Sequence, residues 1–172
     1  GDRWQFVMHA GMGHLPTDVA PDVRGRHYRI EAQVRLNGPQ DEGVLIAHGD
    51  ATSGYSLYLQ GGHLVHDLNI GGVHQVLRSS RPVTAGHHVL GLQMQQGPLT
   101  TVQLPVGPPA QVPAFRRATL LIDGEAVGTA EHPHGFNSLI SWSGLDIGLD
   151  RGSPVSHYEA PYIFTGQLRR VT

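Results

Sequence analysis

The chain has 172 residues, of which 39% are hydrophobic and only 15% charged, and its formal net charge is −2 at pH 7. This length fits one domain with a sizeable core, and the charge excludes the basic face that a nucleic-acid-binding domain needs. The absence of cysteine excludes disulfides, thiolate metal sites and a cysteine nucleophile, although it leaves the cellular compartment open.

Glycine and proline are abundant, at 23 and 12 residues, which is typical of many short strands joined by tight turns. No apolar run approaches the roughly 20 residues that span a bilayer. Neither does the N-terminus carry a charged-then-apolar signal segment. It begins in a strand-like stretch at residues 4–8, as though the chain were cut from something longer.

Residues 28–36 alternate without interruption between apolar and polar side chains. Because successive side chains of a strand point to opposite faces, this pattern predicts a strand with one buried and one wetted face. Residues 43–47 form a continuous apolar run, which predicts a strand covered on both sides. Alternation returns at residues 55–59 and 87–94.

Glycine pairs at 61–62 and 71–72 predict tight reversals between these strands. Asp123-Gly124 is the best hairpin signal, since this pair supplies the positive φ angles of a type I′ turn. Residues 95–117 break the rhythm with five prolines, so we predict an extended surface loop there, with a short edge strand at 99–104.

Roughly ten to twelve strands result, at the spacing typical of a sandwich or barrel, and no helix is predicted. Each sheet must bury its apolar face against another layer. The predicted fold is therefore all-β, a two-sheet antiparallel jelly-roll sandwich of the concanavalin A-like type, forming a single domain over residues 1–172.

The twelve histidines raise the question of a metal site. His87 and His88 would point to opposite faces of a strand, and His132 and His134 flank a proline in a turn-like context. Zinc normally needs three or four convergent ligands. We therefore expect these to be solvated loop histidines and predict no metal site and no cofactor in this chain.

Five residues near the C-terminus are the candidate ligand-binding groups. Trp142 lies in a polar loop where its ring could stack on a sugar, and Asp146 and Asp150 could share one face of a strand. Three interpretations stay open for the segment ending at Ser153: a calcium site, the carboxylate pair of a glycosidase, or a self-bonded turn. The site prediction comprises Trp142, Asp146, Asp150, Arg151 and Ser153, and no catalytic residue.

The order of several motifs resembles the segment that follows the catalytic domain in bacterial arylsulfatases. The final block is the most specific match, and together the motifs cover nearly the whole chain. They are Gly11-Met12-Gly13-His14-Leu15-Pro16, Ala20-Pro21-Asp22-Val23, the segment 43–49, Gly54-Tyr55-Ser56-Leu57-Tyr58-Leu59, the segment 82–88, Leu121-Ile122-Asp123-Gly124, the segment 144–155, and Phe164-Thr165-Gly166-Gln167-Leu168.

This resemblance implies a non-catalytic C-terminal accessory domain of a sulfatase, which packs on the catalytic domain and shapes its pocket or oligomer contacts. The family's catalytic centre is a formylglycine, made within a Cys/Ser-x-Pro-x-Arg motif, beside a calcium ion. The nearest string here, residues 80–84, has Thr84 where the arginine should stand, so no catalytic residue carries over. Relatives tend to have a glycine-rich turn where this chain has residues 95–117.

We accordingly expect no enzyme activity from this chain alone. Its expected partners are the catalytic sulfatase domain of the same polypeptide and other copies of the chain, but not nucleic acid or membrane. We expect a soluble protein, with the bacterial cytoplasm as the favoured compartment. The alternative function is a carbohydrate-binding module of the same fold, using Trp142 and the 150–153 loop.

Overall fold

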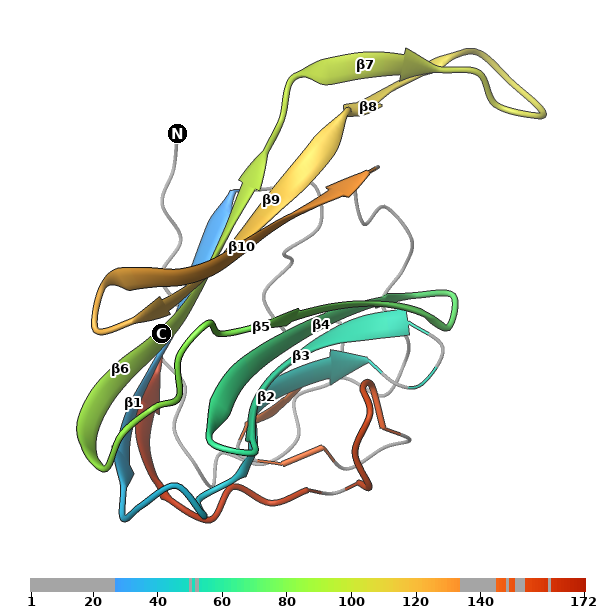
Figure 1. Ribbon diagram of the computed structural model, residues 1–172. Helices are drawn as coiled ribbons and strands as arrows, with labels where there is room; N and C mark the ends of the chain where they lie inside the picture. Colours follow the sequence, from blue (N-terminus) through green and yellow to red (C-terminus); the bar gives the residue numbers. More distant parts are fainter. Residues whose placement is uncertain are drawn as a thin grey trace.

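The computed structural model describes residues 27–49, 51, 53–133, 145–147, 149–150, 154–160 and 162–172, and these contain twelve β-strands and no helix. Two five-stranded sheets face each other as layers, and a two-stranded ribbon extends beyond one end (Figure 1). The strand pairs within all three sheets are antiparallel. The predicted all-β, two-sheet antiparallel sandwich is confirmed.

Sheet A has the strand order β10-β9-β6-β1-β12. Its strands are β1 (Tyr28–Leu36), β6 (Gly86–Gln96), β9 (Phe115–Ile122), β10 (Glu125–Pro133) and β12 (Gln167–Val171). Sheet B has the order β11-β2-β3-β4-β5. Its strands are β2 (Gly43–Gly49), β3 (Ser53–Gln60), β4 (His63–Ile70), β5 (Val73–Arg78) and β11 (Leu145–Ile147).

The main core lies between the two sheets and follows the alternation of the sequence. Along β1 every second side chain from Ile30 to Leu36 is buried, and it meets the inward residues of β6 and β9 from the same sheet. From sheet B, Leu57, Leu64 and Leu68 pack against this layer. This arrangement buries the apolar face of each sheet, which is the dominant stabilising term for such a sandwich.

The outer face of sheet B is covered as well. The cover is the C-terminal segment, residues 154–160 and 162–164, which runs below sheet B in Figure 1. Val44 and Tyr58 of the sheet pack there with Val155, Tyr158 and Tyr162. Val44 and Ile163 also form a parallel bridge, in which the Val44 N–H donates a hydrogen bond to the Tyr162 carbonyl at 2.9 Å. The cover explains why β2 is buried at all seven positions, as its continuous apolar run predicts.

Three two-residue turns set the register of the hairpins. Gly61-Gly62, Gly71-Gly72 and Asp123-Gly124 all have positive φ at both positions. Asp123 has φ of 52° and Gly124 of 82°, as a type I′ turn requires, so the predicted hairpin of β9 and β10 is confirmed.

The proline-rich segment 95–117 is not the extended loop that the sequence predicts. β6 continues to Gln96, β7 (Leu99–Val102) pairs with β8 (Ala110–Pro113), and β9 begins at Phe115. The predicted edge strand corresponds to β7. A two-stranded ribbon has two free edges, and Pro105, Pro108 and Pro109 lie in its connecting turn, so the missing N–H groups of proline break no ladder.

In the part of the chain that the structure describes, no helix has the length and apolar character needed to cross a membrane.

Candidate functional site

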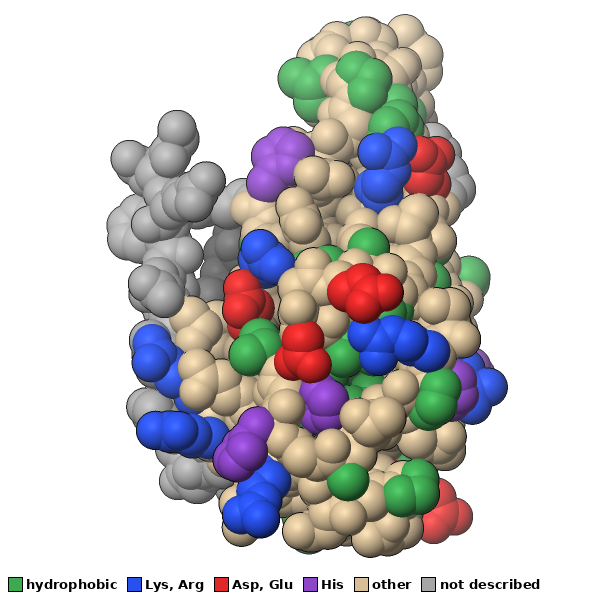
Figure 2. All heavy atoms as spheres, turned by 60° about the vertical axis from the view of Figure 1, so that its left-hand side comes forward, with side chains coloured by type: hydrophobic (Ala, Val, Ile, Leu, Met, Phe, Trp, Pro, Cys, Tyr) green, Lys and Arg blue, Asp and Glu red, His purple; other side chains and the backbone are tan. Residues whose placement is uncertain are grey.

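A hollow of about 600 Å³ opens on the outer face of sheet A, at the end where β1, β6 and β12 lie side by side. We call it the sheet A hollow. Seven of its ten lining residues are polar or charged, and the full set is Gln33, Val34, Arg35, His87, His88, Val89, Asp123, Gln167, Leu168 and Arg169. Figure 2 looks toward this side of the molecule, where Arg and His side chains gather below the acidic ones.

Within the lining of the sheet A hollow, the one carboxylate is already engaged. Asp123 Oδ2 lies 2.6 Å from Nδ1 of His88, and its Oδ1 accepts a hydrogen bond from the Val89 N–H at 2.8 Å. Burial alone would raise the pKa of Asp123, but these two hydrogen bonds and the charges of His88 and Arg81 outweigh it and lower that pKa. Arg35 and Arg169 also line the hollow, so the arginines in its lining outnumber the carboxylates.

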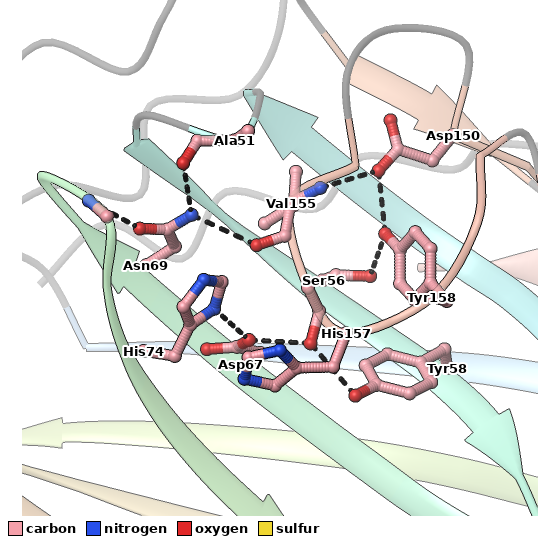
Figure 3. Close-up of polar contacts among 12 residues, drawn as sticks. Ala51, Ser56, Tyr58, Asp67, Asn69, His74, Asp150, Val155, His157 and Tyr158 are labelled. Atoms are coloured by element: carbon pink, nitrogen blue, oxygen red, sulfur yellow. Dashed lines mark hydrogen bonds and ion pairs between the residues drawn. The ribbon is translucent and has the colours of Figure 1, made fainter.

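A second polar region lies between the outer face of sheet B and the C-terminal segment (Figure 3). We call it the outer network, and it comprises Ser56, Tyr58, Asp67, His74, Asp150, Ser156 and Tyr158. Asp67 is fully buried, and its Oδ2 accepts hydrogen bonds from Ser156 Oγ at 2.5 Å and from His74 Nδ1 at 2.6 Å. Since Ser156 donates to Asp67, its oxygen accepts the Tyr58 hydroxyl proton at 2.9 Å.

The other half of the outer network is centred on Asp150. Its Oδ2 accepts hydrogen bonds from the Tyr158 hydroxyl at 2.6 Å and from the Val155 N–H at 3.0 Å, and Ser56 donates to Tyr158. Burial, together with the Asp150 carboxylate, raises the pKa of Tyr158 well above its ordinary value. These bonds hold the C-terminal segment against sheet B.

His157 completes a cluster of three possible metal ligands with Asp67 and His74. Its ring packs on that of His74 with centroids 4.3 Å apart. The ligand atoms of the three residues all lie within 4.8 Å of one another. The sequence prediction missed this cluster, although part of it was readable: the Gly71-Gly72 turn pairs Asn69 with His74, which makes His74 a diagonal neighbour of Asp67 on one face.

A third polar region faces inward between the sheets, and we call it the inner cluster: His66, Gln75, Arg116 and His132. All four have side-chain atoms that are buried without a hydrogen-bond partner among the described residues. Burial, together with the nearby His132, lowers the pKa of His66 to about 3. Burial also lowers the pKa values of His132 and Arg116, which Asp67 and Tyr28 respectively oppose.

This burial corrects the expectation of solvated loop histidines. His132 lies on β10 with 4% of its surface exposed, because its position faces the opposite sheet. His87 and His88 do point to different sides of β6, and His87 is exposed. His134 lies outside the described residues.

The five predicted ligand-binding residues are only partly covered by the structure. Asp150 is 1% exposed and serves the outer network. The backbone of Asp146 lies on β11, where it pairs with Ala47. Trp142, Arg151 and Ser153 lie outside the described residues, so the predicted site stays a prediction.

No family model matches the chain, and no curated protein matches it. Among solved structures, it is similar to the carbohydrate-binding module CBM40 of the Ruminococcus gnavus IT-sialidase bound to α2,3-sialyllactose. The identity is 15%, over 86% of this chain and 75% of that one, with a TM-score of 0.58. The same module bound to α2,6-sialyllactose gives 14% identity, 86% and 76% coverage, and a TM-score of 0.57.

The native SAP-like pentraxin of Limulus polyphemus is also similar, at 15% identity over 92% of this chain and 64% of that one, with a TM-score of 0.50. At such identities the likeness shows the fold alone. The fold is a β-sandwich of the lectin-like type, in agreement with the concanavalin A-like prediction. The arylsulfatase resemblance gains no support from these comparisons.

Proposed function

We propose that this chain is a carbohydrate-binding module without a catalytic centre of its own, and that it binds an acidic glycan in the sheet A hollow. One observation carries the proposal. A hollow of about 600 Å³, with two arginines in its lining, opens on the outer face of sheet A in a lectin-like sandwich. This volume lies in the range of small-molecule binding sites.

The lining suits a sugar that carries a negative charge. The guanidinium group of Arg35 can present two parallel N–H donors to a carboxylate or sulfate, and Arg169 adds a second positive charge to the lining. Gln33 and Gln167 offer both donors and acceptors, which is what sugar hydroxyls require. The Asp123 carboxylate is held by His88 and Val89, so it repels an anionic ligand less than a free carboxylate would.

The other broad face of the sandwich is a poorer candidate, because the C-terminal segment covers it. Tyr58 and Val65 of sheet B are buried beneath Val155 and its neighbours. A glycan could reach that face only if the outer network first came apart.

The structural likeness supports the ligand class. The R. gnavus module is bound to sialyllactose, in which sialic acid contributes a carboxylate. Similarity of fold at 15% identity does not carry over individual residues, so the argument for an acidic sugar rests on Arg35 and Arg169 of this chain.

Calorimetric titration tests the proposal, with sialyllactose, sulfated lactose and neutral lactose as ligands. We expect saturable binding of at least one acidic sugar and weaker binding of lactose. Arg35→Ala should lower the affinity for the acidic sugar at least tenfold, or roughly 1.4 kcal/mol. Binding should also weaken with salt.

Arg29→Ala is the matched control. Arg29 lies on the same strand and the same face of sheet A but outside the hollow, where it pairs with Glu31 at 3.1 Å. It should bind like the wild type. The proposal fails if no acidic sugar binds saturably, or if Arg35→Ala and Arg169→Ala together leave the affinity unchanged.

A role as the accessory domain of a sulfatase rests on the order of sequence motifs alone. It is compatible with glycan binding, since such a module could hold a sulfated polysaccharide near a catalytic domain. Reading the coding sequence upstream of Gly1 tests it: a Cys/Ser-x-Pro-x-Arg motif there supports the parentage, and a different domain contradicts it.

A further inference from the structure

The geometry points to a binding site for one divalent transition-metal ion of the zinc class, formed by Asp67, His74 and His157. The site is new relative to the glycan proposal, and it lies on the opposite side of the sandwich from the sheet A hollow. The three residues come from separate segments: β4, β5 and the C-terminal segment. Figure 3 shows their side chains converging.

The spacing suits a small ion. The candidate ligand atoms lie within 4.8 Å of one another. Zinc bonds of about 2.0–2.2 Å in tetrahedral geometry place ligand atoms roughly 3.4 Å apart. The exposed ring of His157 can move by the difference without disturbing either sheet.

A second observation supports the site independently of this spacing. Asp67 is fully buried, yet its Oδ1 has no hydrogen-bond partner among the residues that the structure describes, while Oδ2 accepts the bonds from Ser156 and His74. A buried carboxylate oxygen without a partner is costly. A cation bound at Oδ1 removes that cost and keeps the bond from Ser156 to Oδ2, while His74 Nδ1 exchanges its bond to Oδ2 for a bond to the ion.

The types of ligand atom in this cluster favour one class of ion over another. Two imidazoles and one carboxylate favour zinc and its neighbours in the first transition series, whereas calcium and magnesium prefer sites made of oxygen ligands. The bond from Ser156 to Oδ2 orients the carboxylate, as groups around metal ligands commonly do. Three protein ligands leave a fourth tetrahedral position open on the solvent side, next to His157.

The effect of the ion is to fasten the C-terminal segment to the β4–β5 hairpin. His157 is 83 residues beyond His74 in the chain (157 − 74), so the ion would cross-link distant segments. An ion that binds the folded state more tightly than the unfolded chain raises the melting temperature by mass action.

The test is titration of chelator-treated protein with zinc chloride, by calorimetry and by thermal denaturation. We expect one ion per chain and a rise in melting temperature at saturation. His157→Ala should bind at least tenfold more weakly and lose most of that rise, and since His157 is exposed, this variant should fold. Cobalt(II) should give the visible absorption of a tetrahedral site in the wild type but not in His157→Ala.

The control is His27→Ala, which removes another exposed histidine, one outside the cluster. It should bind zinc like the wild type, which separates this site from weak binding by the twelve histidines of the chain. Three outcomes overturn the proposal: no stoichiometric binding, equal binding by His157→Ala, or tighter binding of calcium than of zinc. None of them bears on glycan binding.

Discussion

Asp67 and His66 are neighbours on β4, but they enter opposite environments. Asp67 faces the C-terminal segment. It accepts a hydrogen bond from Ser156 of that segment and another from His74 of β5. His66 faces the other sheet, and neither of its ring nitrogens has a hydrogen-bond partner within the described part of the chain. Both side chains are fully buried, so burial alone does not explain the difference.

The difference comes from what faces each residue. In a sheet, the backbone N–H and C=O groups are used in the ladder, so the space between two sheets offers few free donors and acceptors. An irregular segment such as residues 154–160 keeps some of these groups available and adds hydroxyls. The outer network is therefore stabilising where it stands, whereas the inner cluster costs stability in a way that depends on pH.

Asp67→Ala should have the largest effect on the outer network. It leaves His74 and the Ser156 hydroxyl without their acceptor inside a buried region, so we expect a loss of about 4 kcal/mol in the free energy of unfolding. Urea denaturation at pH 7 measures it. Glu125→Ala, which removes an exposed ion pair with Arg81, should cost under about 0.5 kcal/mol. A loss below about 1 kcal/mol for Asp67→Ala would contradict the assignment.

The second largest effect is expected from acid, which should lower the stability of the protein through the buried histidines of the inner cluster. The unfolded chain protonates His66 near pH 6.5, but the folded chain, in which burial lowers the pKa of His66 to about 3, does not. The unfolded state therefore binds more protons between these values, and stability falls as the pH falls from 6.5 toward 3. One such histidine contributes at most about 1.4 kcal/mol per pH unit, or about 2 kcal/mol between pH 6.5 and 4.5. His132 acts in the same direction.

Denaturation series at several pH values check this prediction, with His66→Leu as the comparison. The cross-strand neighbours of His66 are Leu57 and Leu77, so leucine suits the site. This variant should lose much of the slope below pH 6.5. Equal slopes in the two proteins would show that His66 is not buried in its neutral form.

The contrast between the two regions also shows how much of the structure can be predicted from the sequence. Alternation along β1 and the turn at Asp123-Gly124 predicted the strands and one hairpin register, because both depend on neighbouring residues. The same local logic places His74 beside Asp67. His157 could not be placed in this way, because its position depends on how the C-terminal segment crosses sheet B.

Two predictions failed for related reasons. The proline content of residues 95–117 argued against a central strand, but it did not exclude a ribbon with two free edges. His132 looked like a solvated loop histidine, since its neighbour Pro133 suggested a turn, yet strand β10 continues to that proline and turns His132 inward. The sheet A hollow was equally out of reach, because it needs β12 to return beside β1 from the far end of the chain.

Arg116→Met tests whether the buried arginine of the inner cluster costs stability. Arg116 is 1% exposed, and its Nε and one Nη have no hydrogen-bond partner among the residues described by the structure. Replacing a buried charge that lacks a partner by an apolar side chain of similar length should raise the free energy of unfolding by about 2 kcal/mol at pH 7. Chemical denaturation measures the change. A clear decrease in the free energy of unfolding would mean that the buried guanidinium stabilises the folded protein. It would contradict the inference that the inner cluster costs stability.

The smallest of these effects is expected within the outer network, where Ser156 links Tyr58 to Asp67. Ser156→Ala removes one donor from Asp67 and leaves the Tyr58 hydroxyl without its acceptor, which should cost about 1.5 kcal/mol. Tyr58→Phe alone should cost about 1 kcal/mol. In the double variant the second change should cost little, because the hydroxyl that it removes has already lost its partner, so a double-mutant cycle should give a coupling of about 1 kcal/mol. Strict additivity would mean that the hydrogen bond from Tyr58 to Ser156 does not contribute to holding the C-terminal segment on sheet B.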